Sequence, residues 1–118
     1  TGLKIDEPRY FIPPYEWYNG KISEWAKEKQ VQLINFTPGT GSNADYTTPD
    51  MKSYRSSEII NNNILKYEEN ASLNGFMLLI HVGTHPDRTD KFYLHLDSLI
   101  KELKKKGYEF VKVDELLK

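Results

Sequence analysis

His81 is the residue whose type and position in this sequence most clearly suggest chemistry. It directly follows the apolar run 76–80, and an imidazole exchanges protons near neutral pH, so it can serve as a general acid or base. Asp45 lies in a long polar loop, where a carboxylate can orient and charge-stabilise a histidine. The sequence leaves two structural alternatives open: a hydrogen-bonded histidine at the end of a strand, and an aspartate that caps a turn.

The sequence contains two further histidines. His85 follows His81 by four residues, a spacing that brings two metal ligands together only on a helix. Gly83 and Pro86 argue against a helix there, so a shared metal is not the expected interpretation. His95 lies inside a predicted helix and is expected to have a structural role.

Other catalytic signatures are weak. The Gly-Thr-Gly-Ser stretch at 39–42 lacks the Gly-Lys-Ser/Thr ending and the following helix of a phosphate-binding loop. No Gly-x-Ser-x-Gly sequence marks a nucleophilic serine. The chain has no cysteine, which excludes disulfides, thiolate nucleophiles and cysteine-based zinc sites.

A predicted alternation of strands and helices must position these residues. Turn and cap signals support it: Asn19 is a plausible N-cap, as is Ser56 or Ser57, and Gly107 suits the position just past a helix. The residues between 37 and 50 are rich in Gly, Pro, Ser, Thr, Asn and Asp and predict a loop. The predicted strands are 9–12, 31–36, 76–81 and 108–113, and the predicted helices are 21–29, 56–69, 89–106 and 114–118.

This alternation predicts an α/β fold with mostly parallel strands and right-handed crossovers. Ligands of parallel α/β folds lie at the carboxyl ends of the strands. Four segments would meet at that edge, and they hold many of the polar and aromatic residues: 13–18, 37–46, 81–88 and the residues after 113.

The composition argues against nucleic-acid binding, binding to anionic lipid and a membrane span. The 118 residues include 16 basic and 17 acidic ones, and a formal charge of −1 gives no field that would attract nucleic acid or anionic lipid. The longest apolar run has the length of a strand and not of a membrane span. The 8 Tyr, 5 Phe and 2 Trp suit a sugar-binding surface, although core packing explains them equally well. Since Thr1 is not an initiator Met, we expect the true start to lie upstream.

Several ordered motifs resemble the polysaccharide deacetylase family (the NodB homology domain, carbohydrate esterase family 4). The stretch 10–15, Tyr-Phe-Ile-Pro-Pro-Tyr, resembles the family's Phe-Arg-Pro-Pro-Tyr-Gly motif. The Leu-Leu-Ile-His sequence at 78–81 resembles its Leu-x-His motif, and 106–111 resembles its closing Gly-Tyr-x-Phe-Val segment. Asp45-Tyr46 occupies the place of an Asp-Trp motif. The resemblance covers nearly the whole chain in the right order.

The resemblance implies that residues 1–118 are the C-terminal half of a distorted (β/α)7-type barrel. The family binds a divalent metal, usually zinc, through Thr-Phe-Asp-Asp and His-x-x-x-His motifs in its N-terminal half. Neither motif occurs in this chain, so no metal ligand is expected in it and the metal would belong to the missing half. The fragment alone is expected to be inactive.

The same resemblance assigns roles to individual residues. His81 would be the general acid that protonates the leaving sugar amine or alcohol, and Asp45 would pair with its imidazole. The backbone N–H of Tyr15 would hold the oxyanion. Leu79 would line the acetyl pocket. The further substrate-binding candidates are Trp17, Tyr46 and Pro14.

Two departures from the family's motif give a second hypothesis. Ile12 replaces the motif arginine that steadies the catalytic aspartate, and Glu16 replaces its glycine. Arg9 is a poor substitute, because three residues along a strand place it on the opposite face. The alternative is a catalytically inactive glycan-binding domain, and a purely structural half-barrel is the third interpretation.

The partners follow from the leading hypothesis. These are an acetylated glycan, and either the N-terminal half of the same domain or a second copy that covers open strand edges. Nucleic acid is not expected. The family resemblance implies an extracytoplasmic location.

Overall fold

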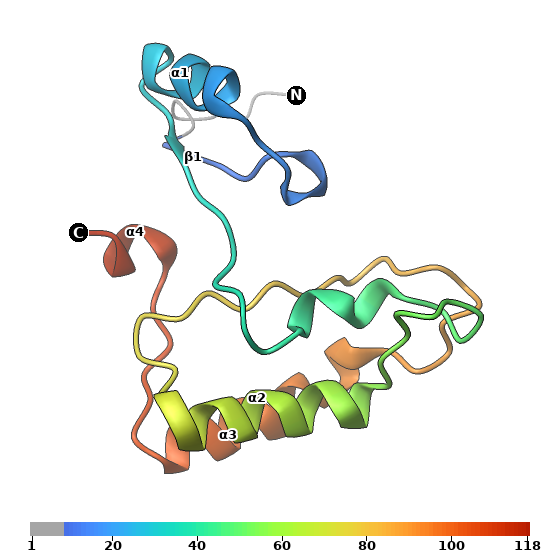
Figure 1. Cartoon of the computed structure of the whole chain (residues 1–118). Helices are drawn as coiled ribbons and strands as arrows, with labels where there is room; N and C mark the ends of the chain where they lie inside the picture. Colours follow the sequence, from blue (N-terminus) through green and yellow to red (C-terminus); the bar gives the residue numbers. More distant parts are fainter. Residues whose placement is uncertain (1–8) are drawn as a thin grey trace, which may run out of the picture. The chain divides into compact units, whose positions relative to one another are not determined.

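A computed structural model describes residues 9–118 of the chain. It divides the chain into two compact units, Thr1–Phe36 and Thr37–Lys118 (Figure 1). Each unit is described by itself. Within residues 9–118, no helix is both long enough and apolar enough to cross a membrane.

The first unit is a small parallel pair of strands joined through a helix. Strand β1 (Tyr10–Phe11) pairs with β2 (Gln32–Leu33), with Tyr10 opposite Gln32. The connection holds a 3-10 turn, η1 (Pro14–Glu16), and helix α1 (Gly20–Glu28). Asn19 caps α1 as predicted, because its Oδ1 accepts the Ile22 N–H at 3.0 Å. The observed strands are shorter than the predicted segments 9–12 and 31–36.

The second unit contains the longer helices. These are α2 (Ser57–Ala71) and α3 (Leu96–Lys105), preceded by the 3-10 turns η2 (Ser42–Tyr46) and η3 (Phe92–His95), with a last short helix α4 (Val113–Leu116). The predicted caps are confirmed: Ser56 Oγ accepts the Ile59 N–H at 3.2 Å, and Gly107 follows α3 with φ of +94°.

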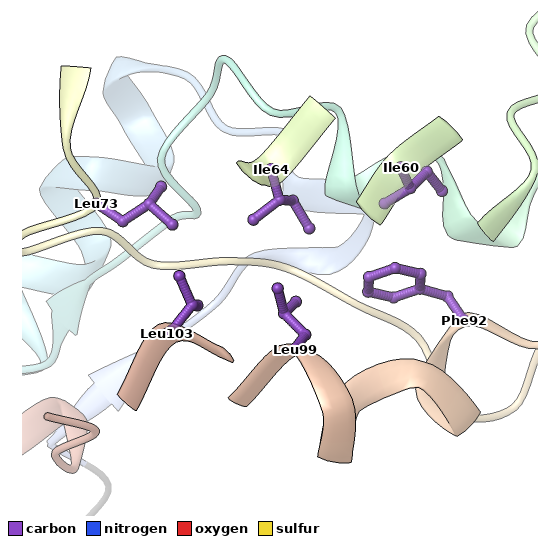
Figure 2. Packing of buried hydrophobic residues seen from close by; sticks show 6 residues of the cluster. All are labelled: Ile60, Ile64, Leu73, Phe92, Leu99 and Leu103. Atoms are coloured by element: carbon purple, nitrogen blue, oxygen red, sulfur yellow. The ribbon is translucent and has the colours of Figure 1, made fainter. Parts of the chain in front are cut away.

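Helices α2 and α3 run parallel and enclose the core of this unit. Figure 2 shows the apolar side chains of the two sides facing each other: Ile60, Ile64 and Leu73 opposite Phe92, Leu99 and Leu103. The polar contacts agree with this direction. Asp90, just before η3, accepts from the first residue of α2, and Lys106 at the end of α3 pairs with Glu68 near the end of α2 at 2.5 Å. Because both helices point the same way, the chain must return between them.

The returning segment 76–81 was predicted as a strand. In the part of the chain that the structure describes, it forms no ladder of backbone hydrogen bonds with a neighbouring strand. Its ties to the loop before η2 are the Thr37 N–H to the Met77 carbonyl at 2.9 Å and the Met77 N–H to Thr37 Oγ1 at 3.1 Å. Its residues are half-buried and not covered on both faces. A strand needs a partner along its length, and within residues 9–118 this segment has none.

Segment 108–113 likewise shows no strand pairing. The Tyr108 hydroxyl instead contacts the C-terminal part of α2. It lies 3.2 Å from Glu68 Oε1 and 3.0 Å from Oγ of Ser72, which directly follows the helix. Parallel helices with a returning segment between them are what an alternating α/β chain produces. The partial (β/α)7-type barrel stays a prediction.

Helix α3 begins later than the predicted start at residue 89 or 90. The Asp90 carboxylate accepts the backbone N–H of Ser57, at 2.6 Å. Asp90 therefore satisfies the first backbone N–H of α2, beside the cap that Ser56 provides. The chain passes through the 3-10 turn η3 before the α-helix starts at Leu96.

Candidate active site

The turn η2 fixes the position of Asp45. Gly41 begins it in the left-handed conformation, with φ of 72°, and its carbonyl accepts the Ala44 N–H at 3.0 Å. Thr47 closes it, since its backbone N–H and its hydroxyl both donate to the Ala44 carbonyl, at 3.0 and 2.6 Å. The Asp45 side chain is fully buried. A buried carboxylate requires hydrogen-bond donors.

His81 supplies those donors. Asp45 Oδ2 accepts the His81 backbone N–H at 2.6 Å, and Oδ1 lies 2.6 Å from His81 Nδ1. Because a carboxylate only accepts, this contact assigns the proton to Nδ1. Nε2 is then the ring atom that is left to exchange a proton with a substrate.

A surface hollow adjoins His81. The His81 side chain is 33% exposed, and the ring of Tyr46 meets it edge-on with ring centroids 5.5 Å apart. The hollow has a volume of about 370 Å³. Besides the rings of Tyr46 and His81, the wall of the hollow contains hydroxyls, carboxylates and a second imidazole. These groups could bind a polar ligand. The remaining lining residues are Thr48, Asp50, Met51, Gly83, Thr84, His85 and Asp87.

The other two histidines have different surroundings. His85 is exposed on the wall of the hollow, where its Nδ1 accepts the Asp87 N–H at 3.2 Å. His95 stacks on Phe92, with centroids 6.4 Å apart. Within residues 9–118, no group of three or more His, Cys, Asp or Glu side chains could hold a metal ion. The family resemblance implies that the metal ligands belong to the other half of the domain.

The other candidate residues are not among those that line this hollow. Leu79 lies half-buried two residues before His81 and does not line the hollow. Tyr15, Pro14 and Trp17 belong to the first unit. Tyr15 is 94% exposed and Trp17 63% exposed, so their rings are available to a ligand.

Glu16 has an unusual backbone for its residue type. Its φ is 56°, in the left-handed region that glycine adopts freely, and glycine is what the family motif has at this position. Its carbonyl accepts from Asn35 Nδ2 at 2.9 Å, which helps to hold the turn.

Arg88 is a buried residue that sequence reasoning missed. Its side chain is fully buried, and Nη1 donates to the Thr47 carbonyl at 2.6 Å. The sequence carried one signal: an arginine between two aspartates in the segment that follows His81. Long charged side chains are usually exposed, so this signal did not predict burial.

The comparison with known proteins found a deacetylase, in agreement with the motifs of the sequence. The chain is 32% identical over 114 residues to the peptidoglycan-N-acetylglucosamine deacetylase of Bacillus cereus, covering 97% of this chain and 47% of that protein. The chain thus spans about half the length of the curated relative it matches. No family model matches, and no solved structure matches. The similarity supports a relationship to the polysaccharide deacetylases at the level of the family.

Proposed function

We propose that this chain is the C-terminal half of a polysaccharide deacetylase domain that hydrolyses acetyl groups from an acetylated poly- or oligosaccharide. The observation that carries the proposal is the Asp45–His81 pair beside the hollow that Tyr46 lines. The similarity to the Bacillus cereus deacetylase, which extends over 97% of the chain, supports the same reaction class.

His81 is the general acid in this proposal. A water oxygen bonds to the acetyl carbon, and the bond from that carbon to the sugar nitrogen or oxygen breaks. The leaving atom takes the Nε2 proton of the His81 imidazolium, which returns to the neutral ring with its proton on Nδ1. Asp45 holds Nδ1 at 2.6 Å, keeps the ring in one orientation and stabilises its positive charge before the transfer. General acid catalysis of this kind contributes roughly 10²- to 10⁴-fold to a rate.

The hollow is the proposed binding site for the sugar unit that reacts. The half-exposed ring of Tyr46 offers an apolar face, while Asp50 and Thr84 offer polar groups to sugar hydroxyls. Leu79 in the acetyl pocket remains a prediction of the resemblance. So do the backbone N–H of Tyr15 at the oxyanion and the contacts of Trp17 and Pro14 with substrate.

The proposal gives this chain the general acid and the oxyanion side of the reaction. A divalent metal, zinc in the family, would polarise the acetyl carbonyl and activate water when it is bound. Its ligands would come from the N-terminal half of the same domain, where the family carries its Thr-Phe-Asp-Asp and His-x-x-x-His motifs. That half, or a second copy, would also cover the edges of the β1–β2 pair. A cell-wall glycan as substrate would place the protein outside the cytoplasm.

A catalytically inactive glycan-binding domain is the second candidate. Ile12 stands where the family has the arginine that steadies its catalytic aspartate, and its side chain is 52% exposed. The exposed rings of Tyr15, Trp17 and Tyr46 would bind glycan without any reaction.

Acetate release distinguishes the two candidates. The protein that contains this chain is incubated with N-acetylated chito-oligosaccharides and O-acetylated xylo-oligosaccharides, with and without a metal chelator. Acetate release that the chelator abolishes supports the deacetylase. Glycan binding that persists with chelator, without any acetate, contradicts it and supports the binding domain.

A further inference from the structure

We propose that Arg88 is a positioning residue, which aims the Asp45–His81 pair by fixing the backbone at Thr47. The inference rests on the proposed function, because it concerns the residues that act in that reaction. It assigns Arg88 no contact with substrate, since the side chain is fully buried and does not line the hollow.

The burial of Arg88 calls for a compensating role. A guanidinium remains charged at every pH a protein tolerates, and removing it from water is unfavourable unless its donors are satisfied. Here the side chain is fully buried, and within residues 9–118 its Nε has no hydrogen-bond partner. The most direct gain is the short bond from Nη1 to the Thr47 carbonyl, at 2.6 Å.

Arg88 joins segments that are far apart in the sequence. Nη1 reaches Thr47 after η2, and Nη2 lies 3.5 Å from the Ser57 hydroxyl at the start of α2. The guanidinium stands 5.3 Å from the ring centroid of Tyr54 and 3.9 Å from Asp90 Oδ2. One side chain thereby joins the end of η2 to the first residue of α2.

The contact with Thr47 bears directly on Asp45. Thr47 closes η2 through its two bonds to the Ala44 carbonyl, and Asp45 lies inside that turn. A 3-10 turn of five residues has few bonds of its own and is weakly held without outside contacts. Fixing Thr47 therefore fixes the direction of the Asp45 carboxylate.

The loop 81–88 is attached to η2 at both of its ends. His81 binds Asp45 inside the turn, and Arg88 binds Thr47 just after it. Loss of the second attachment lets the turn rotate, and the geometry of the first then changes. Any substitution that frees Thr47 should consequently alter the hydrogen bond at His81 Nδ1.

The test reads the tautomer of His81 by long-range ¹H–¹⁵N NMR in the protein that contains this chain. The variants are Arg88→Lys, which keeps the charge, Arg88→Gln, and Thr47→Val. The last removes the hydroxyl's bonds with the Ala44 carbonyl and the Arg55 N–H, and it leaves Arg88 and the Thr47 carbonyl in place. The matched controls are Arg55→Gln, an exposed arginine in the same unit, and Leu103→Ala, a core change distant from η2.

We expect a single Nδ1–H tautomer in the wild type and both controls. Arg88→Gln and Thr47→Val should give a mixture of tautomers, and Arg88→Lys should restore part of the single form. If Arg88→Gln does not fold, Thr47→Val and Arg88→Lys decide the question. A wild-type tautomer in folded Thr47→Val and Arg88→Lys would overturn the inference.

This readout needs no catalysis, so it separates the two claims. A tautomer change in a protein that releases no acetate would support the positioning role of Arg88 and contradict the deacetylase proposal. Acetate release with an unchanged tautomer in the variants would support the deacetylase proposal and contradict the positioning role of Arg88.

Discussion

Asp45 accepts two hydrogen bonds from His81, one from the ring Nδ1 and one from the backbone N–H, each at 2.6 Å. The bond from the backbone N–H fixes the position of the His81 backbone. The bond at Nδ1 fixes the rotation of the ring and its tautomer. A mobile histidine would present either nitrogen to a ligand, whereas this one presents Nε2. The arrangement suits a proton donor that must meet one atom of a substrate.

Tyr46 should contribute to substrate binding more than to the reaction step. Its ring is half-exposed and lies edge-on to His81, so Tyr46→Ala removes apolar contact with a sugar without touching the Asp45–His81 bonds. We expect KM to rise about tenfold, which corresponds to roughly 1.4 kcal/mol, with a smaller change in kcat. Tyr46→Phe, which keeps the ring, is the matched control. Equal KM values for the wild type and Tyr46→Ala would refute this role.

Ile64 should be essential to the stability of the second unit. It is fully buried between α2 and α3, in the cluster that Figure 2 shows. Ile64→Ala should lower the free energy of unfolding by about 2–5 kcal/mol, because it leaves a cavity as well as losing burial. Ile59→Ala, on the same helix but 47% exposed, should change it by less than about 1 kcal/mol. Chemical denaturation followed by circular dichroism compares the two, and equal losses would mean that the core is packed differently.

The Glu68–Lys106 pair should make stability depend on pH at both ends of the scale. Its hydrogen bond lowers the pKa of Glu68 below the ordinary 4.5 and raises the pKa of Lys106 above the ordinary 10.5. Stability from Glu68 is therefore complete above 4.5 and disappears as the pH falls through its lower folded value. Stability from Lys106 is complete below 10.5 and disappears as the pH rises through its higher folded value.

Glu68→Gln tests this dependence. The difference in free energy of unfolding between wild type and variant should be largest from about pH 5 to pH 10 and should shrink towards both extremes. Asp97→Asn, which breaks the exposed pair with Lys101, should change stability little at any pH. A difference for Glu68→Gln that does not vary with pH would contradict the assignment.

Local features of this chain could be predicted from the sequence. Asn19 and Ser56 cap helices because their short polar side chains reach N–H groups three residues away, and Gly107 ends α3 because glycine adopts a positive φ freely. Leu99 and Leu103, four positions apart as on one face of a helix, are both buried in α3.

Features that depend on distant contacts could not be predicted. Segment 76–81 has the composition of a strand, but pairing requires a neighbour that residues 9–118 do not provide along its length. The Asp90 carboxylate accepts a hydrogen bond from the first residue of α2, 33 positions away, and does not begin the helix that was predicted from residue 89. Arg88 is buried by partners 31 and 41 positions away, which no local pattern reveals.

The candidate pair itself was found from the order of motifs and not from spacing. Asp45 and His81 are 36 residues apart, and each alone had an equally good structural explanation. The structure brings them together with Tyr46, while their roles in catalysis remain the central claim to test.

The most direct test of that claim is the kcat of His81→Ala on two acetylated substrates. An N-acetylated oligosaccharide has a poor leaving group that needs a proton, whereas para-nitrophenyl acetate has a good one that does not. We expect kcat to fall roughly 10²- to 10⁴-fold on the oligosaccharide, and far less on the aryl ester, with glycan affinity unchanged. A His81→Ala variant with wild-type kcat on the oligosaccharide would contradict it.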